Sequence, residues 1–186
     1  MDVQIILLGC LTTLYFILPA YFSNGGALAF GGGTPIDFGK SDSNGVRWIG
    51  DGVTWRGLFA GTIIGIITGV IQGSLAPFIL PQIGSNLITP IVTSVSNGIL
   101  IGFLLGFGAL LGDALGSFIK RRLGIGRGKP APILDQLDFL IVALILVSPV
   151  VELNLFFIII AIVLTLVIHL VANGGAYLLG LKDVWY

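Results

Sequence analysis

The chain has 186 residues, of which 55% are hydrophobic and only 10% are charged, and its mean hydropathy is +1.05. Water-soluble domains carry about 25% charged residues, so this composition excludes an ordinary soluble globular protein. Nine basic and nine acidic residues give a net charge of zero, and we expect no nucleic-acid partner. The single cysteine, Cys10, excludes an internal disulfide and a cysteine-based metal cluster.

Five long apolar segments, taken in chain order, predict an all-α integral membrane protein made of one transmembrane domain over residues 1–186. A helix needs about 20 apolar residues to cross a bilayer. The first segment could be a secretory signal peptide, but it lacks a basic start and a small-residue cleavage site. The fourth is long enough only when it is extended back to Leu134. The predicted spans are residues 3–22, 57–80, 90–119, 134–151 and 153–179.

The basic residues predict how these spans are oriented. With five spans, all nine lysines and arginines fall on one side, in connections 23–56 and 120–133 and in the tail after residue 180. Basic residues are concentrated in cytoplasmic loops, so that side is predicted to be cytoplasmic. We therefore expect a multi-pass protein of the cell membrane with its N-terminus outside and its C-terminus in the cytoplasm. The 23–56 connection is then a long, Gly-rich cytoplasmic loop.

Glycine clusters at residues 24–26, 31–33 and 50–52 mark the 23–56 connection. Their exposed N–H groups would suit a phosphate, although a flexible linker explains the same composition. The loop ends in Thr54, Trp55 and Arg56, which supply a hydroxyl, an aromatic face and a guanidinium. A nucleotide base could stack on Trp55, but an interfacial membrane anchor fits that residue equally well.

Asp113 is the most informative polar residue of the third span. It lies seven residues before Lys120, roughly 10 Å deeper along a helix. A carboxylate at that depth costs several kcal/mol unless it is paired or metal-bound. Asp113 shares one helix face with Ser117 and Lys120. A salt bridge to a neighbouring basic residue is the alternative to a functional role.

Two further carboxylates, Asp135 and Asp138, lie three residues apart at the start of the fourth span. Acidic residues there could simply favour the helix dipole. Together with Asp113, however, they form an oxygen-rich set that suits Mg²⁺. The basic run at residues 120–122 would attract anionic lipid, or would hold phosphates beside such a metal.

In the fifth span, His169 and Asn173 lie four residues apart. An interhelical hydrogen bond is the simpler interpretation, and a proton relay is the functional one.

Several of these segments resemble a known family. Residues 112–121 (GDALGSFIKR) and 134–138 (LDQLD) are similar to the signature of CTP-dependent cytidylyltransferases of membrane lipids. Gln136 replaces the arginine of the closing Asp-Arg-x-Asp element, and the His-Gly-Gly element is missing. Segments 19–24, 35–39, 50–57 and 180–182, with His169 and Asn173, are similar to the archaeal branch, the CDP-archaeol synthases. Val53 stands where that branch usually has lysine, and Val184-Trp185 where it usually has Pro-Trp.

The resemblance implies Mg²⁺-dependent transfer of CMP from CTP to a polyprenylated glycerol phosphate lipid in the bilayer. The product is CDP-archaeol, and pyrophosphate leaves. It implies catalytic residues Asp113, Lys120, Arg121 and Asp138, metal ligands Asp113, Asp135 and Asp138, and nucleotide contacts Asn24, Gly50, Asp51, Gly52, Thr54, Arg56 and Ser117. The alternative is a small polytopic transporter or channel with a polar cytoplasmic mouth. Whether the chain forms a homo-oligomer stays open.

Overall fold

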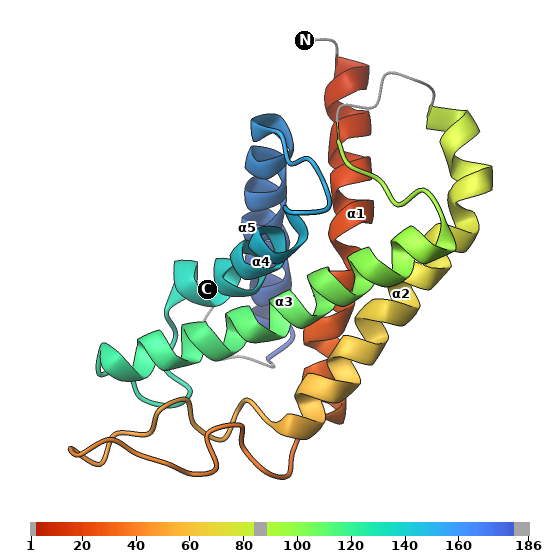
Figure 1. Ribbon diagram of the computed structural model, residues 1–186. Coiled ribbons are helices and arrows are strands. Elements are labelled where there is room, and N and C mark those ends of the chain that lie inside the picture. Colours follow the sequence, from red (N-terminus) through yellow and green to blue (C-terminus); the bar gives the residue numbers. More distant parts are fainter. Residues whose placement is uncertain (1–2, 84–88, 181–186) are drawn as a thin grey trace.

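The computed structural model describes residues 3–83 and 89–180 (Figure 1). This part of the chain contains the helices α1 (Val3–Phe30), α2 (Trp55–Ile83), α3 (Val95–Arg122), α4 (Pro132–Val147) and α5 (Leu155–Leu178). Outside them, two isolated β-bridges pair Pro35 with Thr54 and Ser41 with Arg47. The prediction of an all-α fold is confirmed.

Successive helices run in alternating directions, so their connections gather at two ends (Figure 1). Connections 31–54 and 123–131 lie at one end, together with the last turn of α3. We call this end the polar end, and residues 31–54 the first loop. Every lysine and arginine among the described residues lies at the polar end. The connection 148–154 lies at the other end.

Four helices, α1, α2, α3 and α5, are long and apolar enough to cross a membrane. The chain is therefore a multi-pass membrane protein. Helix α4 has 16 residues, which corresponds to about 24 Å at 1.5 Å per residue. That is shorter than the roughly 30 Å hydrocarbon core of a bilayer. The fifth crossing thus stays a prediction.

Helix boundaries differ from the predicted spans, most of all in α1. The first span was predicted to end at residue 22, but α1 continues to Phe30. Its last turns are packed, because Gly26 lies against Ile64 of α2 and the Ser23 hydroxyl donates to the Gly106 carbonyl at 3.0 Å. The expectation that residues 24–26 form a loop turn was therefore wrong.

The other helices begin at recognisable local signals. Ser94 and Asn154 cap α3 and α5, because their side-chain oxygens accept N–H groups three residues on. Pro132 opens α4 at a position where its missing N–H costs nothing. Because Ser94 caps it, α3 begins five residues later than the predicted third span. Helix α4 ends at Val147, whereas the predicted fourth span continued to residue 151.

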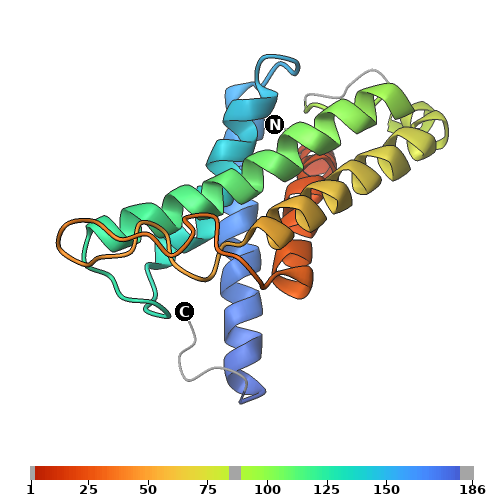
Figure 2. The same ribbon diagram turned by 60° about the horizontal axis from the view of Figure 1, so that its bottom comes forward.

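Helices α2 and α3 pack backbone to backbone, and they run side by side in Figure 2. Glycines at every fourth residue of α2 make this approach possible. Gly65 faces Gly102 of α3, Gly69 faces Gly98, and Gly73 faces Ser94. A methyl group added at Gly65 would lie 2.8 Å from the Gly102 carbonyl oxygen, and one at Gly69 would collide with the Gly98 carbonyl. Small residues of this kind are a common means of packing helices in lipid.

A second glycine row of α3 faces α4. A methyl group at Gly108 would lie 2.7 Å from the Cα of Ala143, and one at Gly112 or Gly116 would collide with Asp138. This close packing places the Asp138 backbone against Gly112 and its carboxylate against Gly116, which are the residues one before and three after Asp113 in α3.

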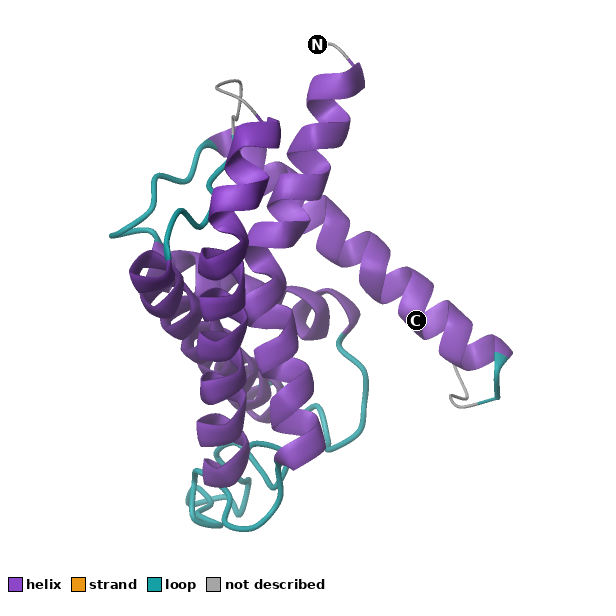
Figure 3. Cartoon of the chain, turned by 90° about the vertical axis from the view of Figure 1, so that its right-hand side faces the viewer, coloured by secondary structure: helices purple, strands orange, loops and turns teal. Residues whose placement is uncertain are grey.

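Helix α5 is attached through its first half. Phe157, Ala161 and Thr165 are buried at four-residue spacing, and the Tyr21 hydroxyl donates to Thr165 at 2.8 Å. Among the described residues after Thr165, none is buried. Figure 3 shows the second half of α5 leaving the other helices.

Candidate active site

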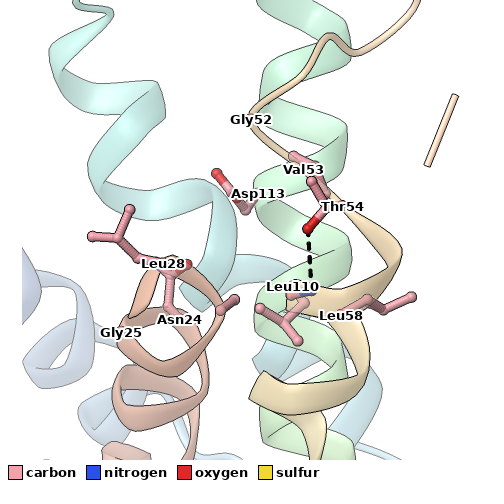
Figure 4. A pocket seen from close by; sticks show the side chains of 11 residues that line it. Asn24, Gly25, Leu28, Gly52, Val53, Thr54, Leu58, Leu110 and Asp113 are labelled. Carbon is pink, nitrogen blue, oxygen red and sulfur yellow. Dashed lines mark hydrogen bonds between the residues drawn. The ribbon is translucent and has the colours of Figure 1, made fainter. Parts of the chain in front are cut away.

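A cavity of about 270 Å³ opens at the polar end, where α1, α3 and the junction of the first loop with α2 meet. Figure 4 shows the side chains around it. They come from α1 (Asn24, Gly25, Ala27 and Leu28), from the loop and the start of α2 (Gly52, Val53, Thr54, Gly57 and Leu58) and from α3 (Leu110 and Asp113). The cavity combines an apolar floor with a few polar groups, as small-molecule sites do.

Asp113 is the charged residue that lines this cavity, and it is partly buried. Within the described residues it has no hydrogen bond or ion pair, and its interactions with Lys120, Asp135 and Asp138 are longer-range electrostatic ones. A carboxylate in an apolar helix is costly unless something compensates its charge. The predicted alternative, a direct salt bridge to a basic residue, is not what the structure shows. Asp113 is therefore available to a cation or a hydrogen-bond donor that enters the cavity.

Thr54 faces the same cavity and is buried. Its side-chain oxygen accepts the N–H groups of Gly32 at 3.2 Å and Gly57 at 3.1 Å, so Thr54 caps α2. A hydroxyl has two acceptor lone pairs and one donor. Since both lone pairs are used, its proton remains for an acceptor in the cavity. The positive end of the α2 dipole also favours an anion there.

The carboxylates of α4 lie close to the last turns of α3. Lys120 pairs with Asp135 at 2.8 Å, and Asp135 also accepts the Ala131 N–H at 2.9 Å. Asp138 accepts the Phe139 N–H at 2.6 Å and interacts electrostatically with Asp113, Asp135 and Lys120. The structure therefore brings together the three predicted carboxylates and Lys120.

These carboxylates do not form a preformed metal cluster, since no three His, Cys, Asp or Glu side chains in the described ranges are arranged to hold a metal ion. Mg²⁺ usually takes only one or two protein carboxylates and completes its shell with water and phosphate oxygens. Asp113 lines the cavity and has no hydrogen-bond partner in the part of the chain that the structure describes, so it fits such a role. The assignment of Asp113, Asp135 and Asp138 to Mg²⁺ stays a prediction.

The remaining predicted residues are not among those that line the cavity. Asp51 pairs with Arg47 at 2.8 Å and with Arg127 at 3.2 Å, while Gly50 lies against the Arg121 side chain. The Arg121 guanidinium donates to the Ile125 carbonyl. Arg56 in the first turn of α2 and Ser117 in α3 are not lining residues. Of the predicted nucleotide contacts, Asn24, Gly52 and Thr54 line the cavity.

His169 lies among rings, 6.5 Å from the Tyr21 ring centroid and 5.9 Å from that of Phe139. It therefore belongs to the packing of α1, α4 and α5. Val53, which stands where the family resemblance expects lysine, is 8% exposed and lines the cavity. Lys182 and the Val184-Trp185 segment lie outside the described residues.

Sequence reasoning missed the role of Asp37 in organising the first loop. Its side chain is 3% exposed and accepts hydrogen bonds from Arg47 and from the N–H groups of Gly39, Ile49 and Gly50. Burial alone would raise its pKa, but these hydrogen bonds outweigh burial and hold the pKa below its usual range. The local signal was Asp37 followed two residues later by Gly39, a spacing typical of an Asx turn.

Known proteins resemble the whole chain. The CarS-like family model, described as CDP-archaeol synthase, matches residues 3–186. A CDP-archaeol synthase from Methanothermobacter thermautotrophicus is 62% identical over 176 residues, covering 95% of this chain and 94% of that protein. One from Methanocaldococcus jannaschii is 48% identical over 174 residues, covering 94% and 96%. A solved structure of an intramembrane enzyme for archaeal membrane lipid biosynthesis superposes with a TM-score of 0.71 at 35% identity, covering 86% of this chain and 91% of that chain.

Proposed function

Because the chain belongs to the CarS-like family of CDP-archaeol synthases and is thus a CTP-dependent cytidylyltransferase, we propose its substrates and chemistry. It transfers the CMP group of CTP to 2,3-bis-(O-geranylgeranyl)-sn-glycerol 1-phosphate. A lipid phosphate oxygen forms the new bond to the α-phosphorus of CTP, and the bond from that phosphorus to the β-phosphate oxygen breaks. Pyrophosphate leaves, and CDP-archaeol stays in the membrane. The family consists of enzymes, so the transporter alternative is set aside.

The observation that carries this proposal is Asp113, a carboxylate that has no hydrogen-bond partner among the described residues and that faces the same cavity as the N-cap Thr54. A phosphate chain with its cation matches both groups, because the cation offsets the Asp113 charge and a phosphate oxygen accepts the Thr54 proton. The wall of α1, with Asn24, and the Gly52 backbone border the nucleotide. No protein nucleophile is needed, since the lipid phosphate is already anionic at neutral pH.

Two basic side chains of α3 stabilise the phosphates as charge develops. Lys120 is held by Asp135, and Arg121 lies against Gly50 at the edge of the first loop. Fixed cations at such positions favour the transition state more than the ground state. Mg²⁺, held by Asp113 and Asp138, would neutralise the triphosphate and polarise its α-phosphorus. Asp135 contributes indirectly, because its ion pair orients Lys120 toward the phosphates.

The same proposal fixes the orientation in the membrane. The described lysines and arginines gather at the polar end, and the positive-inside rule supports placing that end in the cytoplasm. CTP then reaches the cavity from the cytoplasm, and the lipid enters from the side with its chains in the bilayer. With α4 and residues 148–151 as a fifth crossing, the N-terminus is outside and the C-terminus is cytoplasmic.

The test is turnover of labelled CTP by the purified protein with Mg²⁺ in detergent. Digeranylgeranylglyceryl phosphate and phosphatidic acid are supplied in separate reactions, and labelled CDP-lipid is measured. We expect product with the archaeal lipid and release of pyrophosphate in equal amount. Product from both lipids would retain the reaction and remove the lipid selectivity. No product from either lipid, in protein that remains monodisperse, would overturn the proposal.

A further inference from the structure

Arg122 makes several of the contacts that join the first loop to the end of α3. Its guanidinium pairs with Asp42 and donates to the carbonyl oxygens of Arg47 at 2.8 Å and Val46 at 3.3 Å. It also lies 5.0 Å from the centroid of the Trp48 ring. One side chain thus contacts Asp42 and the three loop residues 46–48.

The aromatic part of this contact joins loop and helix directly. Trp48 stacks on Phe118 of α3, with ring centroids 5.9 Å apart and planes inclined by 3°. The Arg122 guanidinium lies 5.5 Å from the Phe118 centroid as well. Arginine supports this geometry better than lysine, because its planar fork donates to several acceptors at once and packs on aromatic faces.

From Arg122 the contacts continue to the cavity. Arg47, whose carbonyl accepts from Arg122, pairs with Asp37 at 2.7 Å. The segment next to Asp37 is joined to the cavity wall, because the Ile36 N–H donates to the Val53 carbonyl at 3.1 Å. Val53 and Thr54 line the cavity. A connected set of contacts therefore leads from the end of α3 to the groups that face the ligand.

We propose that Arg122 is a positioning residue, which holds the first loop against α3 and thereby presents Val53 and Thr54 to the nucleotide. The sequence offered another interpretation for this residue, attraction of anionic lipid by the 120–122 basic run. The structure favours the positioning role, because the guanidinium is occupied by loop acceptors and the side chain is only 29% exposed. Arg122 touches neither the cavity nor the carboxylates of α4, so its effect reaches the reaction only through the loop.

The test compares Arg122→Gln and Arg122→Lys with the wild-type enzyme in two measurements. The first is the rate of tryptic cleavage after Lys40 and Arg47, which depends on how often the loop opens. The second is the KM for CTP and the kcat. If the released loop is docked about one tenth of the time, the KM rises about tenfold. We expect that rise, faster cleavage and a nearly unchanged kcat in Arg122→Gln, with Arg122→Lys in between because it keeps the Asp42 ion pair.

Matched variants separate the loop role from other causes. Lys129→Gln removes an equal charge from an exposed residue of the neighbouring connection and should match the wild type in both measurements. Trp48→Ala breaks the same contact from the loop side and should show the faster cleavage and the higher KM expected of Arg122→Gln. It therefore tests the proposal independently if Arg122→Gln folds poorly. An Arg122→Gln effect that appears only in vesicles with anionic lipid would overturn the proposal in favour of lipid contact. Unchanged loop cleavage would overturn it too.

The KM arm rests on the proposed function, whereas the cleavage arm does not. If the protein turned over no CTP, faster cleavage in Arg122→Gln and Trp48→Ala would still establish that Arg122 holds the loop. A fall in kcat at constant KM would contradict positioning of the nucleotide.

Discussion

The α2–α3 interface and the first loop are held together by opposite means. Between the helices there are hardly any side chains, because glycines such as Gly69 and Gly98 bring the two backbones into contact. The loop has little regular structure, and charged side chains hold it: Asp37 with Arg47, Asp42 with Arg122 and Asp51 with Arg127. The interface should therefore respond to volume and the loop to charge.

The cavity takes its polar groups from both regions. Asp113 belongs to the packed helices and Thr54 to the end of the loop. A rigid carboxylate thus faces a hydroxyl whose place depends on ionic contacts. Substitutions in the two regions should consequently damage the enzyme in distinguishable ways.

The largest effect is expected from Gly69→Val. Its first side-chain carbon would collide with the Gly98 carbonyl, which belongs to a helix backbone and cannot give way locally. We expect a loss of at least about 3 kcal/mol in stability, at the upper end of what overpacking costs. Thermal unfolding in detergent measures it.

Gly174→Ala is the control for this prediction. Gly174 is also a helical glycine, but none of the described atoms lies within 4 Å of an added methyl group. Alanine is the better helix former by about 1 kcal/mol, so this variant should be at least as stable as the wild type. Equal losses in both variants would show that glycine content, and not close approach, is what the fold needs.

Asp113→Asn should leave the helices intact and remove turnover. The amide has nearly the same volume as the carboxylate, and Asp113 has no hydrogen-bond partner within the described residues to lose. We expect kcat/KM to fall by at least about 100-fold, which corresponds to about 2.7 kcal/mol of transition-state stabilisation.

Two measurements on the same preparation of Asp113→Asn test this prediction. The unfolding temperature reports whether the helices stay intact, and CTP turnover reports the loss of activity. Near-normal turnover would remove the metal argument for Asp113. A collapse of stability would instead assign this residue to the packing of α3.

The same contrast explains how far the sequence could lead. Apolar length predicted the helices, and the depth of Asp113 below Lys120 singled out the residue that lines the cavity. The end of α1 was predicted wrongly, because residues 24–26 have the composition of a turn, whereas in the fold Gly26 packs against Ile64 of α2 within a continuous helix. Pairings such as Lys120 with Asp135 depend on how α3 and α4 meet, which no local pattern encodes.

Removing a charge from the first loop is expected to loosen the loop and to reduce CTP turnover less than Asp113→Asn does. Asp37→Asn keeps the shape but loses one acceptor oxygen that takes the N–H groups of Ile49 and Gly50. Breaking such a buried, charged set costs about 2–3 kcal/mol of local stability. We expect a several-fold higher KM for CTP with the unfolding temperature of the bundle nearly unchanged. A drop in the unfolding temperature as large as that of Gly69→Val would contradict the separation of the two regions.

The smallest effect, and the sharpest in sign, concerns pH. Hydrogen bonds hold the pKa of Asp37 below its usual range. The hydrogen bond from the Val46 N–H, together with those from Arg122 and Asn44, likewise lowers the pKa of Asp42. A carboxyl with a lowered folded pKa contributes its full stability above the ordinary value of about 3.9 and loses it as the pH falls through the folded value.

Hydrogen exchange at the Ile49 and Gly50 amides, corrected for its intrinsic pH dependence, should therefore be constant from pH 8 to pH 5 and rise only below about pH 4. In Asp37→Asn the same amides should exchange fast throughout that range. The glycine contacts of α2 and α3 contain no ionisable group, so protection at Gly69 should not follow this curve. Loosening of the loop with a midpoint near pH 6 would mean that a group other than Asp37 holds it, because a carboxyl with a lowered pKa stays ionised there.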